Sequence, residues 1–169
     1  MFTSKLTQAI TSSPPLAAGH CRKRPVLFAP DREAPVLQAE LQRADSVAWY
    51  RNPGHTSPES VGVVYEDGSE MKILRPDFVF FAGTPSGEVV ADIVDPHGFH
   101  LADALPKLKG LADYAEKHGE HYRRVEAVAK VGGVYRVLDL TDHATRAEIR
   151  KASGAEAAYR SGVAHDYSV

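Results

Sequence analysis

Apolar and polar positions alternate along most of this chain in patterns that predict helices and strands. From residue 33 to 44 the apolar side chains recur at helical spacing, which predicts a helix with Asp31 as its N-cap. The acidic and glycine-containing stretch 66–69 predicts a hairpin turn. Runs of apolar residues bounded by glycine, proline or asparagine predict four strands, at 47–50, 61–65, 71–81 and 88–95.

The second half of the chain begins with the best-defined helix. Its apolar stripe consists of Leu101, Ala104, Leu105, Leu108, Leu111, Ala112 and Ala115. Asp103 is the predicted N-cap, because this choice puts Pro106 in the first turn, where an amide needs no helical partner. Gly119 is the predicted C-cap.

Two further strands and a last helix complete the pattern. The strands are expected at 123–131 and 134–140, with Gly132 and Gly133 as the turn between them. The helix is expected from Thr141 or Asp142 to about residue 153. This order of elements predicts an α/β (α+β) fold with a mixed β-sheet flanked by helices. We expect one domain at 31–153, a flexible arm or linker at 1–30 and a frayed C-terminal tail at 154–169.

Composition limits the possible functions without selecting one. The chain has 169 residues, a hydrophobic fraction of 43% and a formal charge of -2, so no overall basic field attracts nucleic acid. Binding to DNA would therefore require local basic patches or another domain. Cys21 is the only cysteine, which excludes an internal disulfide and fits a reducing compartment. No apolar run is long enough to span a membrane, and we expect a cytoplasmic protein.

Two acidic positions carry the candidate chemistry. Asp77 lies among apolar strand residues in Arg75-Pro76-Asp77-Phe78-Val79, where a carboxylate must be paired, protonated or bound to a cation. Asp95 ends the next predicted strand, in the run Asp95-Pro96-His97-Gly98. If neighbouring strands bring these two carboxylates together, they form the oxygen-rich site that Mg²⁺ prefers. A strand-end aspartate paired with Arg75 or Arg51 is the alternative for Asp77, and a simple turn is the alternative for the second run.

The order of helix, hairpin, Pro-Asp strand, second acidic strand, long helix and strand resembles the PD-(D/E)xK nuclease superfamily. Within it the chain is similar to the C-terminal nuclease domain of type III restriction-enzyme Res subunits and related DEAD/DEAH-box helicases. The resemblance covers roughly residues 31–140. It rests on Val47-Ala48-Trp49-Tyr50-Arg51-Asn52, on Arg75-Pro76-Asp77-Phe78-Val79 and on the acidic run ending in His97-Gly98.

The resemblance implies a restriction-endonuclease-like fold and a set of site residues. Asp77 matches the Pro-Asp aspartate that binds the metal, which would be Mg²⁺ or Mn²⁺. The second metal-binding acid is Asp95 or Asp92, and we prefer Asp95 because strand alternation places it on the same face as His97. His97 stands where the family has a lysine.

Two further positions complete the expected set. Lys107 is the candidate replacement for the family's lysine. Glu33 is the candidate acid of the first helix, with Glu40 as its alternative.

The implied activity is metal-dependent hydrolysis of phosphodiester bonds in DNA, as in restriction-modification systems. The implied partners are DNA and a helicase/ATPase or methyltransferase subunit, since the chain has no phosphate-binding loop of its own. Two alternatives remain: an inactive nuclease-like module for DNA contact or assembly, and an unrelated protein in which Asp77 and Asp95 lie far apart.

Overall fold

A computed structural model describes residues 32–168 of the chain. The predicted N-cap Asp31 and the predicted arm at 1–30 lie outside the described residues. The helices are α2 (Glu33–Leu41), α3 (Ala104–His118), α4 (His143–Lys151) and α5 (Ala155–Arg160), with a 3-10 turn at Gly119–His121. The strands are β1 (Ser46–Arg51), β2 (Val63–Asp67), β3 (Glu70–Leu74), β4 (Phe78–Gly83), β5 (Val89–Pro96), β6 (Arg124–Val131), β7 (Val134–Asp139) and β8 (His165–Asp166).

The main sheet has six strands in the order β1-β4-β5-β6-β7-β8. All neighbours are antiparallel except β5 and β6, which run parallel and are joined through α3. A parallel pair needs such a crossover connection, and a helix usually supplies it. The mixed sheet flanked by helices confirms the predicted class at this level.

The strand predicted at 71–81 is divided into two strands, because this stretch contributes to two sheets. Residues up to Leu74 form β3 in a separate two-stranded sheet with β2, and β4 starts at Phe78 in the main sheet. Pro76 lies between them and has no amide hydrogen to donate to a sheet, so pairing changes at this point. The break is also where Asp77 lies.

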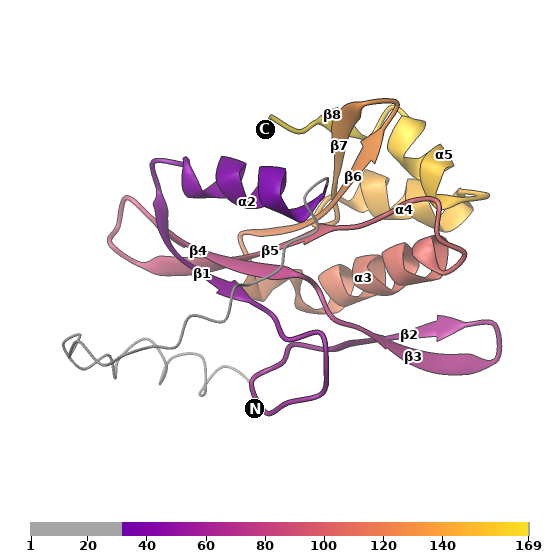
Figure 1. Cartoon of the computed structure of the whole chain (residues 1–169), viewed down its shortest axis with the longest axis horizontal. Helices are drawn as coiled ribbons and strands as arrows, with labels where there is room; N and C mark the ends of the chain where they lie inside the picture. Colours follow the sequence, from indigo (N-terminus) through magenta and orange to yellow (C-terminus); the bar gives the residue numbers. More distant parts are fainter. Residues whose placement is uncertain (1–31, 169) are drawn as a thin grey trace.

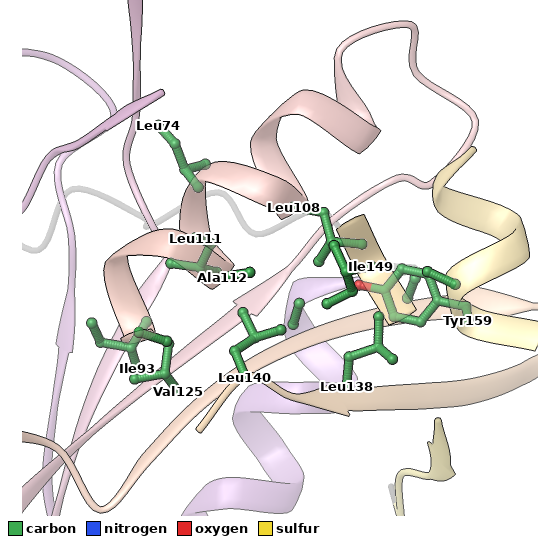
Figure 2. Close-up of a cluster of buried hydrophobic side chains, with 14 of the residues drawn as sticks. Leu74, Ile93, Leu108, Leu111, Ala112, Val125, Leu138, Leu140, Ile149 and Tyr159 are labelled. Carbon is green, nitrogen blue, oxygen red and sulfur yellow. The ribbon is translucent and has the colours of Figure 1, made fainter. Parts of the chain in front are cut away.

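Helices cover both faces of the main sheet (Figure 1), and two clusters of buried residues fill the space between the layers. On one side α2 packs Val36 and Leu37 against Phe78 and Val94 of β4 and β5. On the other side the larger cluster joins α3, α4 and α5 to the sheet (Figure 2), with Leu108, Leu111, Ile149 and Tyr159 almost wholly buried. The alternating side chains of β5 therefore face two different cores.

The β2–β3 hairpin packs on the outer side of α3 (Figure 1). A methyl group at Gly110 of α3 would lie 2.2 Å from Cβ of Tyr65, so only glycine permits this approach of strand and helix. The start of the helix differs from the predicted stripe, since Leu101 precedes α3 and is 47% exposed. Asp103 and Gly119 are the N-cap and C-cap residues, as expected.

The C-terminal stretch 154–168 is folded, and the expectation of a frayed tail from residue 154 is wrong. It forms α5 and the short strand β8, which pairs with β7. Ala158 and Tyr159 are 0% exposed in the larger core. The sequence contains too few apolar residues here for a periodic signal, and tertiary packing supplies the stability. Within residues 32–168 no helix combines the length and apolarity needed to cross a membrane.

Candidate functional site

Asp77 and Asp95 lie side by side at one end of the β4–β5 pair. Phe78 pairs with Val94, so the antiparallel register continues directly to Asp77 opposite Asp95. The backbone amide of Asp77 donates a hydrogen bond to Oδ1 of Asp95 at 3.0 Å. The two predicted acids therefore meet, and the alternative in which they lie far apart is wrong.

Asn52 fixes the turn that presents Asp77. Its side-chain amide donates to the carbonyl oxygens of Pro76 at 2.8 Å and Val61 at 2.9 Å, and its Oδ1 accepts from the amide of Val61. Its own backbone amide donates to the carbonyl of Asp77 at 3.0 Å. Because the residue is buried and these bonds cross three segments, the backbone around Asp77 has a defined position.

Arg51 connects the first helix to this pair of acids. Its Nη2 lies 2.9 Å from Oε2 of Glu33, and its Nη1 lies 3.2 Å from Oδ1 of Asp77. Glu33, at the start of α2, is thus joined to Asp77 through a shared guanidinium group. One arginine stands here among three carboxyl groups, those of Glu33, Asp77 and Asp95. We call these four residues the Asp77 cluster.

The excess of acid has an electrostatic consequence. Burial, and after it the neighbouring Asp95 carboxylate, raise the pKa of Asp77 to about 7 against the opposing charge of Arg51. A carboxyl group with this pKa exchanges its proton near neutral pH. Because like charges and burial disfavour its ionised form, the group gains free energy by binding a cation.

His97 links Asp95 to the core. Its Nδ1 lies 3.5 Å from Oδ2 of Asp95, and its Nε2 lies 3.1 Å from the hydroxyl of Tyr159 on α5. Burial raises the pKa of the Tyr159 hydroxyl well above its usual value, so the group stays protonated and can donate to the imidazole. Both ring nitrogens of His97 thus face protein groups, an arrangement that orients the ring.

The structure separates the other predicted residues from this cluster. Lys107 lies 2.7 Å from Oδ2 of Asp103, one turn earlier on its own helix. Asp92 faces away from Asp95, because the two are an odd number of residues apart on β5. Glu40 is joined through Arg124 to the same group of charges as Asp92.

That group is a second, more fully paired set of charges. Asp92 is 0% exposed and accepts hydrogen bonds from both Arg123 and Arg124. Arg124 also binds Glu40 and Glu126, and these hydrogen bonds and ion pairs outweigh the effect of burial and raise its pKa. We call Asp92, Glu40, Glu126, Arg123 and Arg124 the Asp92 cluster.

The residues present fit one kind of metal site and not another. In the described part of the chain no three residues among His, Cys, Asp and Glu form a group that could hold a metal ion. A site made wholly of side-chain ligands is therefore not formed. Mg²⁺ is often bound by only one or two carboxylates, with water and phosphate oxygens completing its shell, and Asp77 with Asp95 fits that pattern.

Sequence patterns did not indicate Tyr159, since it lies in the stretch expected to be frayed. The run of alanines before Tyr159 is too short to predict a helix, and the contact of Tyr159 with His97 depends on the folded position of α5. Arg51 is one of the two arginines that the sequence offers as a partner of Asp77, and the structure confirms that ion pair. The ion pair of Arg51 with Glu33 depends on how α2 packs against the sheet, which local sequence patterns do not indicate.

Comparison with known proteins places the chain in a family. Residues 20–168 match the model of the YagJ family. This chain belongs to the YagJ family. It is 49% identical over 135 residues to a protein called Protein YagJ from Escherichia coli (strain K12). The alignment covers 80% of this chain and 55% of that relative. The chain thus spans about half the length of the curated relative it matches. No solved structure matches it significantly.

Proposed function

We propose that this chain is a metal-dependent nuclease domain that hydrolyses phosphodiester bonds in DNA. The observation that supports this most is the direct contact of Asp77 and Asp95 at the end of two neighbouring strands, with Glu33 reaching the same place through Arg51. His97 contacts Asp95 in turn. One continuous set of contacts therefore joins four of the residues that the nuclease resemblance singles out: Glu33, Asp77, Asp95 and His97.

The arrangement of elements also supports a restriction-endonuclease-like fold. The chain runs from α2 through the antiparallel strands β1, β4 and β5 to α3 and the parallel strand β6. With the β2–β3 hairpin between β1 and β4, this is the order on which the resemblance rests. By the same resemblance we propose action in the cytoplasm within a restriction-type system, beside a helicase/ATPase or methyltransferase subunit.

Each residue of the site has a role that its contacts suggest. Asp77 and Asp95 would hold Mg²⁺ or Mn²⁺, which neutralises phosphate charge and lowers the pKa of water. His97 acts as a positioning residue, because its ring lies between Asp95 and Tyr159. Arg51 holds Glu33 next to Asp77 and carries positive charge to the place where a phosphate would bind. Lys107 has no role in this proposal.

The test is cleavage of plasmid and linear duplex DNA by the purified chain with Mg²⁺ or Mn²⁺. We expect cleavage that EDTA abolishes and that Asp77→Asn reduces at least a hundredfold, since removing an electrostatic or metal-binding group from such a site typically costs that much. Glu126→Gln is the matched control. Burial raises the pKa of Glu126 to about 7 as well, but this residue belongs to the Asp92 cluster. The control variant should therefore cleave like the wild type.

Two results would contradict the proposal. One is a folded wild-type chain that cleaves neither substrate with either ion. The other is cleavage by Asp77→Asn at the rate of the wild type, which would locate the activity elsewhere.

One observation favours a second function, that of an inactive nuclease-like module for DNA contact or assembly. The guanidinium of Arg51 already lies 3.2 Å from Oδ1 of Asp77, so a positive charge is paired with this carboxylate in the absence of a metal ion. In that case the arginine replaces the ion permanently. This candidate predicts DNA binding that neither Mg²⁺ nor the Asp77→Asn substitution changes, together with the absence of cleavage.

A further inference from the structure

A group of basic side chains lies next to the Asp77 cluster, and the sequence did not single it out. Arg32, at the N-terminal end of α2, lines a shallow depression together with His97 and Lys130. Its charge is close enough to lower the pKa of Asp77. The depression therefore adjoins the proposed reaction site.

Arg32 and His100 converge on Gly98, the residue after His97. A methyl group built at Gly98 would lie 3.3 Å from Nη1 of Arg32 and 3.2 Å from Cε1 of the His100 ring. The absence of a side chain at Gly98 therefore leaves room for both groups over the backbone. His100 is exposed, and its ring stacks edge-on against Phe99 at 5.7 Å, which limits its orientations.

Arg32 makes no ion pair and no hydrogen bond to an acid among residues 32–168, although its charge acts on Asp77 from a longer distance. Every other arginine in this range has an ion pair or a hydrogen bond to an acid, a carbonyl or a hydroxyl group. Lys130 is also exposed and lies 5.3 Å from the ring centre of Tyr135, with no acid paired to it in the same range. Two cations that form no ion pair within residues 32–168 thus line one depression, which is an arrangement that attracts an anion.

We propose that Arg32 and Lys130, with His100 beside them, bind phosphate groups of the DNA backbone and guide the strand to the Asp77 cluster. This inference rests on the proposed function, since it names the surface by which the substrate is held. Backbone phosphates suit the site because guanidinium and ammonium groups pair with them without reading sequence. The weakly negative net charge of the chain makes such a local patch necessary.

The test is a binding assay with a short fluorescein-labelled DNA duplex, followed by anisotropy in EDTA over a series of salt concentrations. All proteins carry Asp77→Asn, so that neither metal binding nor cleavage contributes. Arg32→Ala and Lys130→Ala should each weaken binding about tenfold at low salt. Each should also reduce the slope of log affinity against log salt by about 1. Lys151→Ala removes an exposed lysine at the end of α4 and is the matched control.

The outcomes separate this inference from the nuclease proposal. Loss of affinity and slope in the Arg32 and Lys130 variants, but not in the Lys151 variant, supports the phosphate site whether or not the wild type cleaves DNA. Equal affinity in all variants overturns the phosphate site and leaves the cleavage test as it stands. Pyrophosphate is added as a competitor: if it displaces the duplex only from proteins that keep Arg32 and Lys130, phosphate is the group that they recognise.

Discussion

Strand β5 contributes Asp95 to the Asp77 cluster and Asp92 to the Asp92 cluster, but the carboxylates of the two clusters are paired differently. Asp92 is wholly buried and accepts hydrogen bonds from two arginines, and the hydrogen bond to Asp92 is the main reason that the pKa of Arg123 is raised. Asp77 shares a single arginine with Glu33 and lies beside Asp95, so burial and repulsion raise its pKa to about 7. The Asp92 cluster has two arginines for three acids, whereas the Asp77 cluster has one arginine for three acids.

The difference indicates what each cluster does. A buried acid with two arginine partners loses much when a partner is removed and has little to gain from a metal ion. When the ionised form of an acid is disfavoured, the folded protein becomes more stable if a cation binds to the acid or if the charge of the acid is removed. The Asp92 cluster therefore stabilises the packing of α2 on the sheet, while the Asp77 cluster is suited to binding and catalysis.

The largest expected difference is in stability. Asp92→Asn leaves two arginines without their shared acid, and we expect the free energy of unfolding in urea to fall by about 3 kcal/mol. Asp77→Asn removes a carboxylate that burial and Asp95 already disfavour, so its effect should stay within about 1 kcal/mol. If the two substitutions lower the free energy of unfolding by the same amount, the two clusters do not differ in how they stabilise the fold, which contradicts this comparison.

A smaller difference is expected in the pH dependence of stability. The pKa of Asp77 is about 7 in the folded chain and 3.8 ordinarily, so between these values the folded state keeps a proton that the unfolded state has lost. Stability from this group is therefore present at low pH and lost as pH rises through about 7. Relative to Asp77→Asn, the free energy of unfolding of the wild type should fall by roughly 2 kcal/mol between about pH 4 and pH 8. This value includes a reduction because the side chain is partly exposed to solvent.

Urea unfolding of both proteins at several pH values measures this effect. Other acids titrate in both proteins, so their contributions cancel in the difference. A difference that stays constant over this pH range, or one that grows in favour of the wild type, would show that the carboxyl of Asp77 is not held in its neutral form.

The smallest expected effect is at Tyr159. Tyr159→Phe removes the hydroxyl that binds His97 and should lower the free energy of unfolding by about 1 kcal/mol. Tyr65→Phe is the control, because Tyr65 is buried in the same core and its hydroxyl makes no hydrogen bond within residues 32–168. Equal costs for the two substitutions would mean that the bond to His97 adds nothing to stability.

The sequence predicted the parts of this molecule that depend on local patterns. The stripe of α3, the hairpin turns and the apolar run of β5 predicted most elements, and the alternation along β5 favoured Asp95 over Asp92 as the partner of Asp77. Residues whose roles depend on contacts between distant segments were not predictable. Arg51 joins β1 to α2, and Tyr159 reaches His97 only because α5 packs beside it. Lys107 forms an ion pair with Asp103 on its own helix, which is a nearer partner than the acids at the strand ends.

The association of Mn²⁺ with the chain tests the central claim most directly, and it can be followed by isothermal titration calorimetry at pH 8. We predict binding of the ion to the wild type and to Glu126→Gln, and loss of that binding in Asp77→Asn and in Asp95→Asn. Binding that survives both substitutions in the Asp77 cluster, or a wild-type chain that binds no ion at all, would contradict the account.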